Sequence, residues 1–317
     1  MSDLISKINF FSDKATFETI NDSYSGAILK KVKDEDNTYF LKIIKKSDVD
    51  INRIQKILQI YENYNINTIK LLDYGYINDS VYLIYNFING FALNKAYDKY
   101  NNKDYGNIGF HIGHSYRTIN LNYENDTYFL NDYNISVLTN QTIDSFQNLY
   151  NGKLSYIKKI INEEKMERII NRMKDLVSSF DDEKKVYIHT DIHPKNIMID
   201  DNNGIHIIDI ESFSIDYFVM NLRWSISAAF SNTKNNDFFK GFINGYYNND
   251  IPTTFNKQLI FVTILSFIEH FNRFSEASNI DYVNRYVSRI NHIFDSVDLF
   301  GNDNILENTK IFKESEK

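Results

Sequence analysis

The chain has 317 residues, of which 43% are hydrophobic and 24% charged, enough for one or two globular units with buried cores. It contains no cysteine, which excludes a disulfide scaffold, a cysteine nucleophile and a thiolate metal site. The net charge of −7 argues against a nucleic-acid binder and is compatible with a cationic small molecule, although simple solubility explains it equally well.

No targeting or membrane-spanning segment is visible in the sequence. The longest apolar stretch, residues 259–268, is about half the length that a membrane helix requires. The first residues lack the basic and apolar regions of a secretory signal. We therefore expect a cytoplasmic protein with no membrane partner and no nucleic-acid partner.

The first ninety residues have the pattern of a small unit of strands and one helix. The predicted elements are strands at 25–33 and 38–46, a helix at 49–64, and strands at 68–77 and 80–88. Turn-like residues at 34–37 and Asn78-Asp79 join the two strand pairs as hairpins. This order predicts an α+β unit.

The remainder of the chain, after the turn at Asn89-Gly90, is mostly helical. Residues 153–180 and 255–274 both show a strong helical period. Residues 92–150 are polar, rich in Asn and Tyr, and show no clear period, so their elements are placed only loosely.

A short hairpin is predicted in the second half of the chain. Apolar runs at 197–199 and 205–208 flank the turn residues Asn203-Gly204. Because a strand rises about 3.3 Å per residue, Asn196 before the first run should lie beside Asp209 after the second. Asp191 stands five residues before Asn196, in a loop at the same end of the hairpin. Ordinary turn residues are the alternative explanation, since polar residues are common where a hairpin opens.

The three side chains fit the requirements of phosphoryl transfer. Magnesium prefers hard oxygen ligands, which Asn196 and Asp209 can supply. Asp191 is then available to accept or orient the proton of a hydroxyl group. A metal site, a base and a positioned nucleotide are the parts that this chemistry needs.

The same residues resemble a known superfamily. His189-Thr190-Asp191, then Asn196, then Ile208-Asp209-Ile210-Glu211 resembles the catalytic and metal-binding loops of protein-kinase-like enzymes. The variant HTDIHPKN with IDIE is closer to the aminoglycoside phosphotransferase and choline kinase branch. The resemblance implies a two-lobed, protein-kinase-like α+β fold. Residues 1–88 would form a small β-rich nucleotide-binding N-lobe, and residues 89–317 a larger, mostly helical C-lobe with the catalytic loop and acceptor site.

The resemblance also implies a nucleotide site. Lys42, in the run Tyr39 to Ile43, matches the strand lysine that grips the α- and β-phosphates. Ser25 and Gly26 stand where the phosphate-covering loop should be, although the glycine-rich pattern of protein kinases is absent. Backbone groups of the hinge, near Asn86, Phe87 and Ile88, would hold the base of ATP or GTP.

One departure concerns the partner of the strand lysine. The family pairs this lysine with a Glu on the following helix, and Gln55 is the best match in this chain, with Glu62 as the alternative. A neutral Gln could hydrogen-bond to Lys42 without forming an ion pair. A nucleotide-binding protein without turnover therefore stays open as an alternative.

The resemblance implies a γ-phosphate transfer that uses Mg²⁺, held by Asn196 and Asp209. Asp191 would be the catalytic base, and His193 stands where protein kinases carry a Lys that touches the transferred phosphate. The acceptor would be a hydroxyl of a small molecule, which could be cationic. An aminoglycoside-type antibiotic is favoured, as in antibiotic resistance, and choline, ethanolamine or another metabolite is the alternative. A protein kinase is disfavoured because no activation segment with an A-P-E motif follows Asp209.

Residues beyond the hairpin are harder to assign. Asn221 stands where the resembled family often has an acid before a Leu. Trp224 has apolar neighbours and is expected in the core of a helix and not at a cation–π site. Glu269, His270 and Asp281 lie on late helices, where the family often builds its acceptor site, but solvated helix faces account for them better one by one.

Overall fold

The computed structural model describes residues 5, 7–20, 27–122, 127–131, 133–152, 161–229 and 232–276. They form two compact units: the first contains residues up to Ala96 together with Lys195–Glu211, and the second contains Tyr97–Pro194 and the residues from Ser212 onward. The first unit extends beyond the division expected at residue 88, because a strand at residues 90–92 pairs with the hairpin that follows Asn196.

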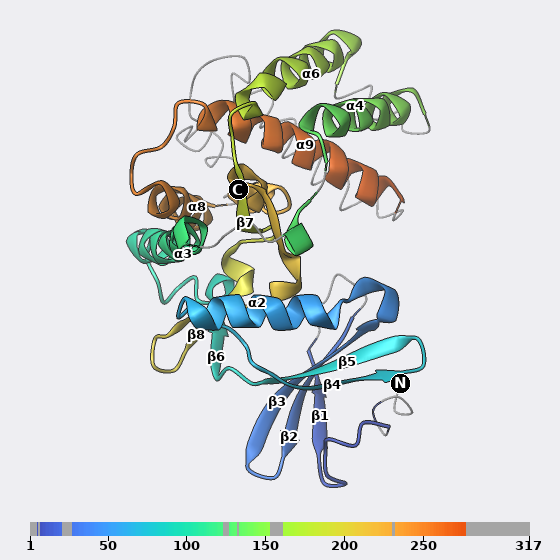
Figure 1. The fold of residues 1–317 in the computed structure, drawn as a ribbon, viewed down its shortest axis with the longest axis vertical. Helices are drawn as coiled ribbons and strands as arrows, with labels where there is room; N and C mark the ends of the chain where they lie inside the picture. Colours follow the sequence, from blue (N-terminus) through green and yellow to red (C-terminus); the bar gives the residue numbers. More distant parts are fainter. Residues whose placement is uncertain are drawn as a thin grey trace. The chain divides into compact units, whose positions relative to one another are not determined.

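A five-stranded antiparallel sheet forms most of the first unit, in the order β1-β2-β3-β5-β4 (Figure 1). Its strands are β1 (Thr16–Thr19), β2 (Ile28–Asp34), β3 (Asn37–Lys45), β4 (Leu71–Ile77) and β5 (Ser80–Asn86). Glu35 and Asn78 adopt left-handed backbone angles in the two tight turns, with φ of 51° and 53°. The four predicted strands are confirmed, and β1 is an addition that the sequence pattern did not indicate.

One helix, α2 (Ile51–Asn63), lies along this sheet (Figure 1). Asp50 caps its N-terminus, because the Asp50 side chain accepts a hydrogen bond from the backbone N–H of Arg53. Its inward face is apolar and consists of Ile51, Ile54, Ile57, Ile60 and Tyr61. The predicted helix at 49–64 is therefore confirmed, and η1 (Lys46–Asp48) precedes it.

A second sheet of the first unit contains β6 (Gly90–Ala92), β8 (Ile197–Asp200) and β9 (Ile205–Ile207), in the order β6-β8-β9. The predicted β8–β9 hairpin is confirmed, with Asn203 left-handed at φ 65°. The Asp200 carboxylate closes the turn by accepting hydrogen bonds from the N–H groups of Asn202 and Gly204. On β9, the Nε2 atom of His206 lies 2.7 Å from Oδ2 of the same carboxylate.

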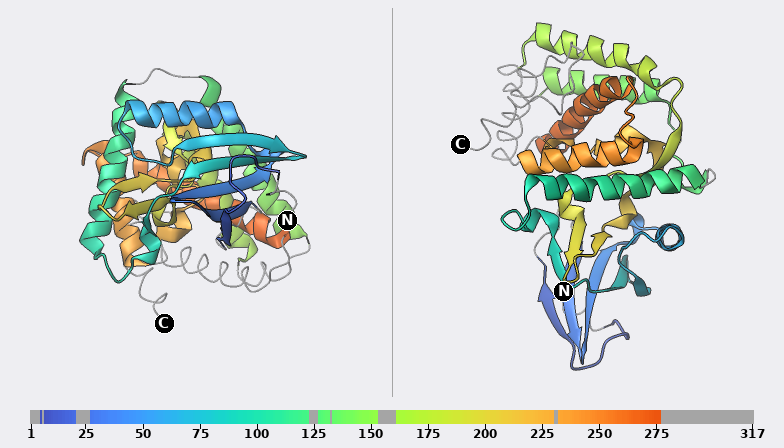
Figure 2. Two further views of the ribbon diagram at one scale, coloured as in Figure 1. Left: turned by 90° about the horizontal axis from the view of Figure 1, so that it is seen from below. Right: turned by 90° about the vertical axis from the view of Figure 1, so that its left-hand side faces the viewer.

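The second unit is mainly helical (Figure 2). Its helices are α3 (Asn102–Asn122), α4 (Ile135–Asn151), α6 (Glu163–Leu176), α7 (Ile226–Ala229), α8 (Thr233–Tyr247) and α9 (Phe255–Glu276), and its strands are β7 (Lys185–His189) and β10 (Phe213–Tyr217). The predicted helix at 255–274 is confirmed as α9. The one at 153–180 corresponds to α6 and η4 (Val177–Phe180), while residues 153–160 lie outside the described residues. No helix in the described ranges is both long and apolar enough to cross a membrane.

Helices α3 and α8 lie side by side in unusually close contact (Figures 1 and 2). A Cβ atom added at Gly109 would lie 2.0 Å from the Phe238 carbonyl oxygen, and one at Gly113 would lie 2.0 Å from that of Phe242. Gly241 and Gly245 of α8 approach the backbone of α3 in the same way. These glycines explain why the sequence of α3 shows no clear apolar period: part of its buried face consists of residues without side chains.

Candidate active site

Lys42 is the centre of a charged cluster in the first unit. It lies in the middle of β3, opposite Leu29 of β2 and Leu83 of β5. Its Nζ is 2.9 Å from Asp209 Oδ1 and 3.0 Å from Glu211 Oε1. The side chains of Lys42, Asp209 and Glu211 are 14%, 40% and 20% exposed, so the lysine is the most enclosed of the three.

The two carboxylates keep Lys42 charged despite its burial. Burial by itself would lower the pKa of this lysine, because it penalises the ammonium form. The charges of Glu211 and Asp209, with their hydrogen bonds to Nζ, outweigh that penalty and raise the pKa of Lys42 above its ordinary value. A permanently charged lysine suits the binding of phosphate oxygens.

The hairpin places Asn196 and Asp209 as predicted. Ile197 pairs with Ile207, and the Ile208 N–H donates a 2.9 Å hydrogen bond to the Asn196 carbonyl, so the residues flanking the hairpin are neighbours. Asp209 has a φ of 60°, a conformation that is uncommon for a residue with a side chain and that is often found at functional sites.

The donor chemistry at this place fits magnesium. A carboxylate and an amide oxygen are hard ligands, and magnesium usually takes one or two ligands from protein and the rest from phosphate and water. Asp209 is the most exposed carboxylate of the cluster, and Asn196 is 8% exposed beside it. In the part of the chain that the structure describes, no group of three or more His, Asp or Glu residues is arranged to hold a metal ion.

The structure gives Lys42 partners different from those expected on α2. Gln55 and Glu62 are both exposed, because the apolar residues of α2 occupy the face that packs inward. Among the described residues, Lys42 instead pairs with Asp209 and Glu211. Sequence reasoning missed Glu211 for this role, although its position two residues after Asp209 in the IDIE motif was a usable signal.

The predicted hinge lies between β5 and β6. The Asn86 N–H donates to the Lys70 carbonyl at 3.1 Å, and the Asn86 side chain accepts from the Lys70 N–H at 2.5 Å, so Asn86 fastens β5 to the segment before β4. Phe87 and Ile88 follow outside the strand ladder, and Lys31 Nζ lies 4.4 Å from the centre of the Phe87 ring. The Asn86 N–H is therefore already engaged within the first unit, and base binding by the backbone of Asn86, Phe87 and Ile88 stays a prediction. Ser25 and Gly26 lie outside the described residues.

Asp191 and His193 lie together in the second unit, on the loop that follows β7. The His193 Nε2 is 3.4 Å from Asp191 Oδ1, and the Asp191 N–H donates to His189 Nδ1 at 3.3 Å. The loop is fastened to the residue that precedes β10, since the N–H and the hydroxyl of Thr190 both donate to the Ser212 carbonyl at 3.0 Å. Both site residues are partly exposed, as groups that meet a substrate must be.

Asn221 supports the start of this loop. Its side-chain oxygen accepts a 2.8 Å hydrogen bond from the N–H of His189, and its Nδ2 donates to the Phe218 carbonyl at 2.7 Å. Asn221 and His189 are completely buried. Asn221 is the last residue but one of η7 (Phe218–Leu222), which directly follows β10. The sequence marks Asn221 only as a departure from the family pattern, and its contact with His189 is a finding of the structure.

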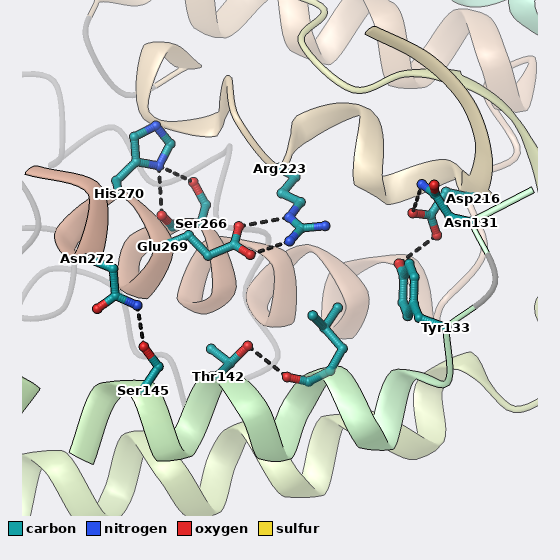
Figure 3. Close-up of polar contacts among 11 residues, drawn as sticks. Asn131, Tyr133, Thr142, Ser145, Asp216, Arg223, Ser266, Glu269, His270 and Asn272 are labelled. Carbon is teal, nitrogen blue, oxygen red and sulfur yellow. Dashed lines mark hydrogen bonds and ion pairs between the residues drawn. The ribbon is translucent and has the colours of Figure 1, made fainter. Parts of the chain in front are cut away.

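A second ionic contact lies beyond Asn221, on α9 (Figure 3). Arg223 binds the Glu269 carboxylate through two hydrogen bonds, of which that from Nε is 2.8 Å long. The expectation that Glu269 lies on a solvated helix face is therefore wrong, because Arg223 covers it. Trp224 does not lie in a helix core as expected: it is half-buried in the turn before α7, with its ring 5.4 Å from that of His270 and 5.3 Å from the Arg223 guanidinium carbon. Asp281 lies outside the described residues.

Asp216 is a buried acid on the neighbouring strand β10 (Figure 3). Its carboxylate accepts hydrogen bonds from the Tyr133 hydroxyl at 2.6 Å, from Asn131 Nδ2 at 3.1 Å and from the Tyr217 N–H at 2.7 Å. Burial raises the pKa of Asp216, and these hydrogen bonds offset the effect only in part. The contacts fasten the segment before α4 to β10.

These groups define a class of protein. A buried lysine held by two acids, a carboxylate–amide pair at a hairpin opening and an aspartate-bearing loop are the components of a phosphotransferase. The sequence pattern of the phosphotransferase enzyme family matches residues 17–254, which is well over half of the chain. The chain belongs to this family, which confirms the predicted class of small-molecule phosphotransferase. Comparison with curated protein sequences gives no match.

Solved structures share the fold at low sequence identity. A spectinomycin phosphotransferase bound to ADP and spectinomycin superposes with a TM-score of 0.60 at 15% identity, covering 95% of this chain and 93% of the other. A microcompartment-associated aminopropanol kinase gives 0.66 at 13% identity, with 95% and 98% covered. An ethanolamine kinase of Plasmodium vivax gives 0.54 at 19% identity, with 90% and 82% covered. These similarities confirm the predicted protein-kinase-like α+β fold.

Proposed function

We propose that this protein transfers the γ-phosphate of ATP or GTP to a hydroxyl group of a small molecule that carries an amine, with an aminoglycoside-type antibiotic as the first candidate. The observation that carries the proposal is the enclosed Lys42, held at 2.9 and 3.0 Å by Asp209 and Glu211. Such an arrangement keeps a positive charge fixed where phosphate groups must be bound.

The first unit would bind the nucleotide. Lys42 would hold the α- and β-phosphates, and Ser25 and Gly26 would cover these phosphates. The backbone of Phe87 and Ile88 would hold the base. Asn196 and Asp209 would hold Mg²⁺, which when bound neutralises charge on the phosphates. Asp209 would then exchange part of its contact with Lys42 for the metal, as its greater exposure permits.

The second unit would act on the acceptor. Asp191 would accept the proton of the attacking hydroxyl or orient that hydroxyl toward the phosphorus. His193, 3.4 Å from Asp191, would hydrogen-bond to the phosphate being transferred. Asn221 and Ser212 hold the loop that carries both residues, so the loop need not reorganise during the reaction.

The choice of an amine-bearing acceptor is supported by two observations. The chain carries a net charge of −7, which attracts cations. Proteins with the same fold are titled spectinomycin phosphotransferase, aminopropanol kinase and ethanolamine kinase. A role in antibiotic resistance and a cytoplasmic location remain predictions that accompany the first candidate.

Small amino alcohols such as ethanolamine or choline are the second candidate, favoured by the two kinase titles above. A nucleotide-binding protein without turnover is less favoured. That alternative depended on the absence of a Glu at the position of Gln55 on the helix, and Asp209 and Glu211 contact Lys42 instead.

A phosphoryl-transfer screen tests the proposal. The protein is incubated with Mg²⁺ and ATP or GTP and a panel of aminoglycosides, choline, ethanolamine, other amino alcohols and sugars, and mass spectrometry detects an added phosphate. We expect a product from one class in the wild type and none from Asp191→Ala, which should still bind nucleotide. An equal yield of product from Asp191→Ala would refute its assignment as the base.

A further inference from the structure

The partner of Lys42 must satisfy two demands at different stages. Before nucleotide binds, it must hold a buried ammonium group, and afterwards it must keep that group aimed at phosphate. Asp209 meets the first demand at 2.9 Å, but it is 40% exposed and is itself the proposed metal ligand. A carboxylate that turns to a metal ion gives up part of its contact with the lysine. A second, more permanent partner is therefore needed.

Glu211 has the surroundings of such a partner. Its Oε1 accepts hydrogen bonds from Lys42 at 3.0 Å and from the hydroxyl of Tyr85 at 3.4 Å. Tyr85 is fully buried in β5, two positions along from Leu83, the residue opposite Lys42. The other carboxylate oxygen, Oε2, is also buried, and it has no hydrogen-bond partner among the described residues. Glu211 is thus enclosed next to the lysine with one oxygen already committed to it.

The resembled family takes the acid for this lysine from the helix, and here that source is closed. Gln55 carries no charge, and both Gln55 and Glu62 are exposed on α2. Turning either toward Lys42 would require rotating α2 about its axis. That rotation would remove Ile54 and Ile57 from the core, at a cost of about 1.5–3 kcal/mol for each side chain.

We propose that Glu211 is the positioning residue for Lys42, in place of an acid from the helix, and that it keeps the ammonium group aimed at the nucleotide phosphates when Asp209 binds metal. This inference rests on the proposed nucleotide-binding function of the first unit. It assigns Glu211 to the lysine and not to the metal ion, which distinguishes it from a third metal ligand.

The first test needs no nucleotide. An amine-reactive acetylating reagent is applied to the full-length protein, and mass spectrometry follows the modification rate of Lys42. We expect Glu211→Gln to raise this rate several-fold, because the lysine loses a carboxylate that keeps it protonated and enclosed. Glu62→Gln is the matched control and should leave the rate unchanged. An unchanged rate in Glu211→Gln would overturn the pairing itself.

The second test measures nucleotide affinity by calorimetry, once in EDTA and once with Mg²⁺. We expect Glu211→Gln to weaken nucleotide binding about tenfold in both conditions. In a protein that already carries Lys42→Met, the Glu211→Gln substitution should cause no further loss of affinity. An effect that needs Mg²⁺ and persists in the Lys42→Met background would make Glu211 a metal ligand and overturn the proposal. Introducing Gln55→Glu into the Glu211→Gln variant should not restore affinity, since Gln55 points outward, and a full rescue would also contradict the proposal.

The two tests separate the two possible failures. Suppose that the wild type bound neither ATP nor GTP while Glu211→Gln still altered the labelling of Lys42. The proposed function and the role of Glu211 in nucleotide binding would then both be wrong, but the pairing of Glu211 with Lys42 would stand. If Glu211→Gln did not fold, Glu211→Asp keeps the charge and withdraws it by one methylene. It should give smaller changes in the same directions, and wild-type values for both labelling and affinity would overturn the proposal.

Discussion

Replacing Asn221 with alanine removes the side chain that holds the start of the Asp191 loop. The His189 N–H and the Phe218 carbonyl would both lose a hydrogen bond while staying buried. The His189 N–H is left without its partner, whereas the Phe218 carbonyl can still accept a hydrogen bond within η7. A buried donor without a partner costs about 1–3 kcal/mol, so we expect the free energy of unfolding to fall by about that amount. Urea unfolding of the wild type and the variant measures this loss.

The Asn221→Ala substitution should also reduce kcat, because Asn221 holds the start of the loop that carries Asp191. His189 stands two residues before Asp191, and a displacement of about 1 Å in a catalytic group can cost about a hundredfold in rate. We expect kcat to fall about 10- to 100-fold, with little change in KM for the nucleotide. Steady-state kinetics with the acceptor identified by the screen provides the measurement.

Asn120 of α3 offers a matched control, because it supports the same strand, β7. Like Asn221, Asn120 makes two side-chain hydrogen bonds to backbone groups. It donates to the Tyr187 carbonyl at 3.0 Å and accepts from the Tyr187 N–H at 2.7 Å. Asn120→Ala should therefore lose a comparable amount of stability, while its kcat stays within about twofold of the wild type. If Asn221→Ala lost stability but kept kcat as Asn120→Ala does, the argument that Asn221 positions the loop would be refuted.

Two further predictions concern the second unit. Burial raises the pKa of Asp216 in the folded state, so the folded protein binds the carboxyl proton of Asp216 more tightly than the unfolded chain does. The contribution of Asp216 to the free energy of unfolding therefore falls as pH rises above about 3.8, the ordinary pKa of this group. Urea unfolding between pH 4 and 8 should show the wild type losing stability relative to Asp216→Asn as pH rises, and a difference independent of pH would contradict this. Gly109→Ala should lower the thermal midpoint, because its Cβ would lie 2.0 Å from the Phe238 carbonyl oxygen, and such overpacking costs about 1–3 kcal/mol. Gly106→Ala on the same helix is the control, because its new Cβ would lie 3.6 Å from the Asp237 carbonyl oxygen, an ordinary contact distance. The thermal midpoint of this variant should stay the same or rise. Equal losses in both variants would argue against the close packing of α3 and α8.

Local sequence patterns determined the elements whose stabilising interactions are short in range. The hairpins of the first unit were predictable because alternating apolar residues and turn residues such as Asn78 specify them within a few positions. The β8–β9 hairpin followed from the same kind of signal at Asn203-Gly204, and with it the adjacency of Asn196 and Asp209. The motif residues of the proposed site are therefore recognisable in the amino-acid sequence alone.

Elements stabilised by distant partners were not predictable in this way. Helix α3 lacks an apolar period because Gly109 and Gly113 pack against the backbone of α8, more than a hundred residues later. Strand β10 acquires its role from pairing with β7, in which Phe213 lies opposite His189. Neither contact leaves a local trace in the sequence.

The choice of charge partners depended on the tertiary structure for the same reason. The sequence marked Lys42 as a phosphate ligand and suggested Gln55 or Glu62 as its partner, since a helix acid is usual in the resembled family. The amphipathic phase of α2 turns both residues outward, and the hairpin brings Glu211 to the lysine across 169 positions of sequence. The residue types needed for the chemistry were thus fixed by the sequence, whereas the pairing of their charges required the folded first unit, because an ion pair depends on distance in space.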